Sequence, residues 1–252
     1  MINTLNVLES LSASDAGKPL KEIASDTGLL KSSAFRILFT LKEAGYVEQA
    51  GQNGAYGLTL KTAGLSKKNA ERLSLVAVAR PHLTELQEQL EESVALAERR
   101  SGSVILVDVI ECSQPLRLSF QAGDDCPVHA TALGKAVAAF LPKDELDHWL
   151  RKHVFPRYTP QTNTALAALR AELQRVQRAG FAVNDEETVA GAFLVGAPIF
   201  DSRENVCGAV SVNAPVARCS PAHRKLLTAR SVRTARAISE DLARIGYTHS
   251  IA

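Results

Sequence analysis

Residues 19–46 read PLKEIASDTGLLKSSAFRILFTLKEAGY, and this stretch decides the fold of the N-terminal part of the chain. Pro19 suits the first position of a helix, because that position needs no N–H donor, and Gly28 supplies a turn. A second helix is predicted over 32–44, with Gly45 ending it. The stretch therefore predicts two short helices joined by a tight turn.

A short hairpin is expected directly after these helices. Residues 47–50 and 55–58 flank the sequence Gly51-Gln52-Asn53-Gly54, which is typical of a turn between two strands. Two helices followed by a hairpin are the order of parts in a winged helix-turn-helix, in which the hairpin is the wing. This order predicts binding to double-stranded DNA.

The second helix has two different faces. Ala34, Ile37, Leu38 and Leu41 recur at helical spacing and are expected to pack inward, while Ser32 and Ser33 are expected to cap its start. The other face carries an Arg for guanine or phosphate, hydroxyls for phosphate, and a ring for a thymine methyl. The predicted DNA-contacting residues are Lys31, Ser32, Ser33, Phe35, Arg36 and Thr40.

Local charge sets a limit on this prediction. Residues 1–68 hold eight Lys or Arg against six Asp or Glu, so one copy would neutralise few phosphates and bind DNA weakly. A homodimer on a palindromic operator is therefore expected. A helical subdomain that contacts another protein, as in a sensor or adaptor, is the alternative interpretation.

Whole-chain composition constrains the remaining possibilities. The chain has 252 residues, a net charge of +2 and four widely spaced cysteines, which indicate neither a zinc finger nor a disulfide framework. No leader pattern or apolar run of about 20 residues is present. We expect a soluble cytoplasmic protein that uses no cofactor, no metal and no membrane.

The chain is long enough for a small DNA reader and a second domain. A helix containing Ile2, Leu5, Leu8 and Leu11 is expected to pack under the helix pair. Residues 60–78, including Leu65, Leu73 and Val76, read as a connecting helix, and Pro81 as a new helix start. The predicted domains are therefore a winged helix-turn-helix over 1–60, a linker helix over 61–80 and a second domain over 81–252.

The second domain alternates strands and helices. Strands are expected at 94–97, 104–110, 116–120, 193–200 and 206–212, and helices near 131–141, 144–154, 164–179 and 221–245. The simplest arrangement is an α+β domain with a mostly antiparallel sheet and helices packed on it.

Three groups of segments together form a specific sequence pattern. They are 30–36 with 41–47, then Val128-His129-Ala130-Thr131-Ala132-Leu133-Gly134-Lys135-Ala136, and finally 180–187 with 196–201 and 208–212. In these segments the chain resembles, over essentially its full length, the IclR family of bacterial transcriptional regulators. The resemblance implies a GAF-like effector-binding domain, DNA-binding domains paired in a homodimer, and in many members a dimer of dimers. The candidate effector residues are Phe120, His129, Thr131, Ala132, Leu133, Asn184, Phe193, Leu194, Ser211 and Asn213.

The residues also suggest what an effector would need. A helix starting near 130–133 would offer free N–H groups and its positive end to a carboxylate, although every helix has such an end. Ser211 and Asn213 share one face of a strand. The family commonly has Asp at the position of Asn184 and a small residue at that of Leu194. We therefore expect a less polar or differently shaped ligand than a very small hydroxy or keto acid, still an organic acid or a related compound.

Other chemistry has less support. Phe120, Phe193 and Leu194 could form an apolar wall of the pocket or simply pack in the core. The run 185–187 could bind a metal with His129 or Asp124, but a solvated loop is the more common role of such a run. An enzyme using His129, Cys126 or this run is a further alternative, which no diagnostic motif supports.

Overall fold

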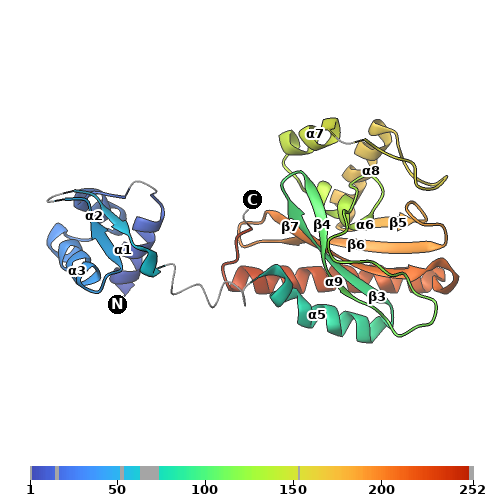
Figure 1. Cartoon of the computed structure of the whole chain (residues 1–252), viewed down its shortest axis with the longest axis horizontal. Helices are drawn as coiled ribbons and strands as arrows, with labels where there is room; N and C mark the ends of the chain where they lie inside the picture. Colours follow the sequence, from blue (N-terminus) through green and yellow to red (C-terminus); the bar gives the residue numbers. More distant parts are fainter. Residues whose placement is uncertain (1, 15–16, 52–53, 63–73, 153, 250–252) are drawn as a thin grey trace. The chain divides into compact units, whose positions relative to one another are not determined.

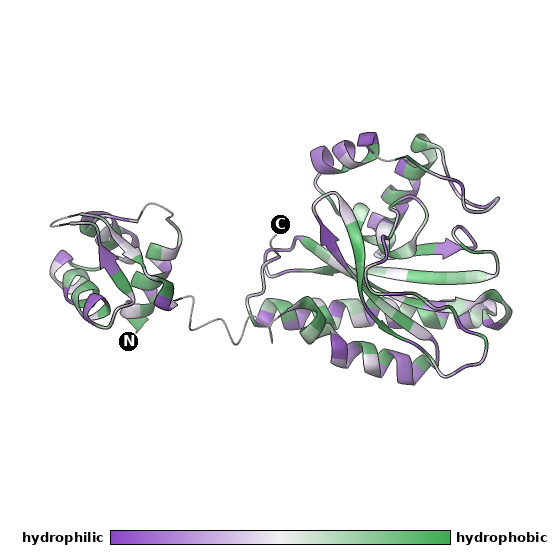
Figure 2. Cartoon of the chain, in the orientation of Figure 1, coloured by the Kyte–Doolittle hydropathy of each residue, from purple (hydrophilic) through white to green (hydrophobic). Residues whose placement is uncertain are grey.

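The computed structural model describes residues 2–14, 17–51, 54–62, 74–152 and 154–249, which belong to two compact units, 1–72 and 73–252 (Figure 1). Each unit has its own hydrophobic core. In Figure 2 the helices carry both purple and green stretches, whereas the long strand β6 (Ala192–Phe200) is mostly green and white. This is the pattern of amphipathic helices covering a buried strand.

The first unit is a winged helix-turn-helix. Its elements are α1 (Ile2–Ser12), α2 (Leu20–Thr27), α3 (Lys31–Glu43), β1 (Val47–Gln49) and β2 (Tyr56–Leu58). Gly28 ends α2 with a φ of 66°, a conformation that glycine adopts without strain. The strands β1 and β2 pair antiparallel, with Val47 opposite Leu58. The expected helix pair and hairpin are confirmed.

Two details of this unit differ from expectation. Val7 and Leu11 are the buried residues of α1, whereas Ile2 and Leu5 are 74% and 55% exposed. A period of three drifts around a helix of 3.6 residues per turn, so the four-residue series cannot stay on one face. The expected capping by Ser32 and Ser33 is also wrong, since α3 begins at Lys31 and both serines lie inside it.

The second unit contains a five-stranded antiparallel sheet. Its strands are β3 (Ser93–Arg100), β4 (Ser103–Ile110), β5 (Ala182–Asp185), β6 and β7 (Val206–Pro215), in the order β4-β3-β7-β6-β5. This confirms the predicted α+β class with an antiparallel sheet.

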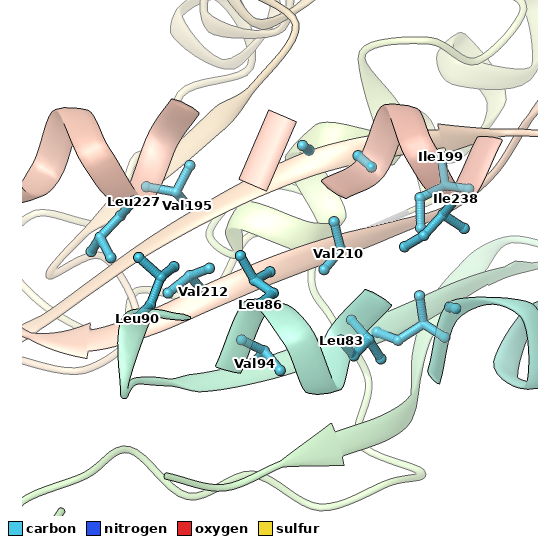
Figure 3. Packing of buried hydrophobic residues seen from close by; sticks show 14 of the residues in the cluster. Leu83, Leu86, Leu90, Val94, Val195, Ile199, Val210, Val212, Leu227 and Ile238 are labelled. Atoms are coloured by element: carbon cyan, nitrogen blue, oxygen red, sulfur yellow. The ribbon is translucent and has the colours of Figure 1, made fainter. Parts of the chain in front are cut away.

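Helices cover both faces of that sheet (Figure 1). On one face lie α5 (Leu75–Leu90) and α9 (Pro221–Arg244), and Figure 3 shows how side chains such as Leu83, Leu86 and Ile238 pack on strand residues such as Val210. On the other face α6 (Ala132–Ala138) lies against β6 and β7, with α8 (Leu166–Ala179) packed on α6. Trp149 and Leu150 of α7 (Lys143–Lys152) join the core of that face.

Three expectations for this unit need correction. Residues 116–120 do not form a strand, because the edge of β4 is taken by 123–126, where Leu106 N–H donates to the Asp124 carbonyl. The strand β5 was not expected. Pro81 does not start a helix but lies inside α5, whose buried face of Ala79, Leu83, Leu86 and Leu90 packs on the sheet. Residues 65 and 73 of the expected connecting helix lie outside the described residues.

Candidate functional site

The exposed face of α3 is the candidate DNA-contacting surface. Ala34, Leu38 and Leu41 are buried, which fixes the rotation of the helix. Of the six predicted contact residues, five are exposed and Ser33 is half-buried. Phe39 is also exposed, by 57%, and Thr40 Oγ1 donates to the Arg36 carbonyl at 3.0 Å. The exposed face of the helix thus combines basic, hydroxyl and aromatic side chains, and no other described element of its unit covers it.

The second unit holds a cavity of about 340 Å³ on the α6 face of the sheet. This volume lies at the small end of the range for ligand pockets, about 300–1,000 Å³. The lining residues come from the sheet, the start of α6, the segment between β4 and α6, the segment between α7 and α8, and the loop after β5. They are Ala95, Leu106, Phe120, Asp124, Asp125, Cys126, Pro127, Thr131, Ala132, Leu133, Tyr158, Asn184, Thr188, Val189, Leu194, Ser211 and Asn213.

Strand register brings the polar floor of this cavity together. Leu194 of β6 lies opposite both Asn184 of β5 and Asn213 of β7. Ser211 Oγ donates to Asn213 Oδ1 at 2.9 Å, so the Asn213 Oδ1 acceptor is already used. Asn213 Nδ2 is buried and has no hydrogen-bond partner among the described residues. The floor therefore offers an unused N–H donor to a bound molecule.

Asn184 has a different role from Asn213, although both line the cavity. Its Nδ2 donates to Thr188 Oγ1 at 2.7 Å, and its Oδ1 accepts from Glu187 N–H at 2.8 Å. These two bonds fold the loop after β5 back over the strand. Asn184 thus shapes the wall formed by Thr188 and Val189, and its amide is largely occupied by the protein itself.

Glycine at position 196 lets the start of α6 reach the floor. A Cβ on Gly196 would lie 2.5 Å from the Ala132 carbonyl oxygen and 3.1 Å from Leu133 N. Thr131 caps α6, because its Oγ1 accepts from Gly134 N–H at 2.9 Å. Ala132 and Leu133 follow the cap and form part of the cavity wall.

The mouth of the cavity is acidic. Asp124 and Asp125 are exposed, and Asp124 Oδ2 accepts from Gln121 N–H at 3.0 Å. Partial burial, and then the negative charge of Asp125, raise the pKa of the Tyr158 hydroxyl, which also lines the cavity. None of the residues that line the cavity is Lys, Arg or His.

A buried cluster of three charged side chains, Lys135, Glu172 and Glu187, lies outside the cavity lining. Lys135 of α6 is fully buried, and its Nζ donates to Glu172 Oε1 of α8 and to Glu187 Oε1, each at 2.6 Å. Burial raises the pKa of Glu187, and the adjacent Lys135 opposes that rise. The cluster joins α6 and the loop after β5, which both line the cavity, to α8, which does not line it, and so fixes the positions of these two parts of the wall.

Eight of the ten predicted effector residues line the cavity, and two do not. His129 lies outside the lining: its Nε2 is 2.9 Å from the Pro156 carbonyl oxygen, and its ring packs on Phe155 and Tyr158. Phe193 packs on the opposite face of the sheet, under the Arg224 guanidinium. The alternation of side chains along a strand could have excluded Phe193, because its neighbour Leu194 faces the cavity.

Sequence reasoning missed several lining residues, among them Asp125, Tyr158, Thr188 and Val189. No spacing rule links them, because they lie on loops that converge only in the folded domain. Asp125 had one weak signal, since it directly precedes Cys126 in the segment leading to α6. Tyr158 had none.

Two carboxylates of the acidic run are held in ion pairs, and the Cys126 thiol is buried. Asp185 pairs with Arg224, Glu187 with Lys135, and the described residues contain no group of three metal-ligating side chains that could hold a metal ion. Burial raises the pKa of the Cys126 thiol to about 12, which leaves it protonated and unreactive at neutral pH. Among the described residues, no helix is long and apolar enough to cross a membrane.

Comparison with known proteins matches both units of the chain to one family. Residues 2–51 match the model of the IclR helix-turn-helix domain, and residues 67–240 match that of the C-terminal domain of the bacterial transcriptional regulator IclR. The chain belongs to the IclR family. Its members regulate transcription and are not enzymes, so the enzymatic alternative is wrong.

Curated relatives and solved structures agree with this assignment. The DNA-binding transcriptional repressor YiaJ of Escherichia coli is 31% identical over 241 residues, which cover 94% of this chain and 86% of the relative. The transcriptional repressor IclR of Escherichia coli is 28% identical and covers 85% of this chain and 79% of the relative. A regulator from Rhodococcus sp. RHA1 has a similar structure, with a TM-score of 0.67, 31% identity and 98% coverage of both chains. The chain is therefore an IclR-family DNA-binding transcriptional regulator with a C-terminal effector domain.

Proposed function

We propose that this regulator reads a palindromic operator with α3 of two subunits and that a small organic acid, or a related compound, bound in the cavity changes its affinity for DNA. The exposed face of α3 supports the first part. It carries Lys31 and Arg36 but few other charges, so two copies are needed for firm binding.

The floor of the cavity supports the second part. A buried amide donor without a partner, beside the first residues of α6, suits an oxygen acceptor such as a carboxylate. If binding in the cavity changes the affinity for DNA, then DNA must change the affinity for the effector by the same factor. The coupling therefore has a direct thermodynamic test in either direction.

The test of the DNA-reading surface is the variant Arg36→Ala. Operator fragments would be selected from random DNA with the full-length protein, and affinity measured by fluorescence anisotropy at several salt concentrations. Loss of one guanidinium contact is expected to weaken operator binding about tenfold to a hundredfold, and to leave the thermal stability unchanged.

Arg175→Ala is the matched control, because Arg175 is also an exposed helical arginine but lies on α8. It should bind the operator like the unaltered protein. Unchanged operator affinity in Arg36→Ala would refute the assignment of α3. Sedimentation of the protein with the operator should give two subunits, or a multiple of two, per site.

A further inference from the structure

The cavity has opposite chemical character at its two ends. The floor residues Ser211 and Asn213 are at most 1% exposed, and the floor ends in the unpartnered N–H donor of Asn213. At the mouth, the exposed carboxylates of Asp124 and Asp125 line the cavity instead. A molecule that reaches from floor to mouth meets a donor first and negative charge second.

The charge around the cavity is not balanced by a cation. None of the lining residues is Lys, Arg or His, and no salt bridge among the described residues involves Asp124 or Asp125. Lys135 lies nearby on α6, but its ammonium is shared between Glu172 and Glu187. A second carboxylate on the ligand would therefore face repulsion at the mouth without a compensating charge.

From this polarity we infer that the effector is a small zwitterion-like molecule. One oxygen acceptor, a carboxylate, meets the Asn213 amide, and a cationic nitrogen meets Asp124 and Asp125. Its middle is apolar, because Leu106, Phe120 and Leu194 also line the cavity. This inference rests on the proposed function, and it narrows the ligand from organic acids in general to amino-bearing monocarboxylates.

The experiment compares ligands that share one skeleton and differ only at the far end. Full-length protein would be titrated with para-(aminomethyl)benzoate, para-(hydroxymethyl)benzoate, para-methylbenzoate and benzene-para-dicarboxylate, and with the matching straight-chain five-carbon acids. Binding is read as a thermal shift and confirmed by calorimetry. In at least one series the amino member should bind about tenfold more tightly than the methyl and dicarboxylate members, and this preference should shrink with added salt.

Two variants then test whether Asp124 and Asp125 cause the tighter binding of the amino member. In the double variant Asp124→Asn, Asp125→Asn the advantage of the amino member should fall about tenfold, while the dicarboxylate binds better than before. Both positions are exposed, so the fold should tolerate the change. Glu88→Gln removes an exposed carboxylate from α5, away from the cavity lining, and should leave the preference intact.

The outcomes separate this inference from the proposed function. If methyl, hydroxyl or dicarboxylate members bind as tightly as the amino members, the inference is overturned, although acid sensing stands. A preference that survives in the double variant also overturns it. If no member of either series shifts the melting temperature or the operator affinity, both the inference and acid sensing fail.

Discussion

The two faces of the five-stranded sheet are built on the same strands but differ in how closely they are packed. Side chains at alternate positions of β6 and β7, such as Val195 and Val212, form a dry core with α5 and α9 (Figure 3). Their neighbours Leu194, Ser211 and Asn213 face α6 and line a cavity that includes an unsatisfied amide. Both faces contain a core that stabilises the domain, but the α6 face forgoes some packing where the cavity lies.

The largest expected effect concerns the ion cluster behind the cavity. Lys135→Met removes the ammonium shared by Glu172 and Glu187 and leaves two partly buried carboxylates facing each other. We expect a loss of about 3–5 kcal/mol in the free energy of unfolding, measured by chemical denaturation. A loss below about 1 kcal/mol would show that the cluster does not hold the cavity face together.

The same variant has a defined pH dependence. Burial already raises the pKa of Glu187 above its ordinary value of 4.5, and removal of Lys135 raises it further. A raised folded-state pKa contributes stability below the unfolded value, and this contribution is lost as pH rises through the folded value. The penalty of Lys135→Met should therefore be smaller at about pH 5 than at about pH 8. An equal penalty at both pH values would contradict this explanation.

The next effect compares one truncation on each face. Ile238→Ala on α9 leaves a void in the dry core and should cost about 3 kcal/mol. Leu194→Ala removes the same kind of apolar bulk, but from a wall that already borders open space, and should cost only about 1–2 kcal/mol. Denaturation of both variants tests this, and equal costs would mean that the cavity face is packed as tightly as the other.

The smallest effect on stability should come with a large effect on binding. Asn213→Leu replaces a buried amide that lacks a partner for its Nδ2 with an apolar group of similar size. Stability should stay within about 1 kcal/mol of the unaltered protein, because the lost bond from Ser211 is offset by relief of the unsatisfied donor. The affinity for carboxylate ligands, measured by calorimetry, should fall at least about tenfold. Unchanged affinity would show that the ligand carboxylate does not bind to the Asn213 amide.

Much of the architecture could be predicted from local sequence. The helix pair with its hairpin and four of the five strands follow from periodicity and from glycines such as Gly28. The failures share a cause. Residues 116–120 have strand composition but no free sheet edge to pair with, and Pro81 remains in a helix because packing on the sheet outweighs one missing hydrogen bond.

The candidate site could be predicted only in part. Positions 131–133, 184, 211 and 213 lie on the cavity lining, and the family resemblance had pointed to them. His129 lies beside them in sequence but packs on Phe155 and Tyr158, because a step of one or two residues turns a side chain away. Sequence spacing alone does not carry this directional information across a loop.

The sequence by itself determined the family, the two-unit organisation and the inward face of α3, because these depend on short-range periodicity and on motifs read along the chain. Only the tertiary structure decided the chemistry of the cavity. Asp124, Tyr158, Val189 and Asn213 come from four separate segments. Strand register and loop packing bring them together, and such long-range contacts leave no local pattern in the sequence.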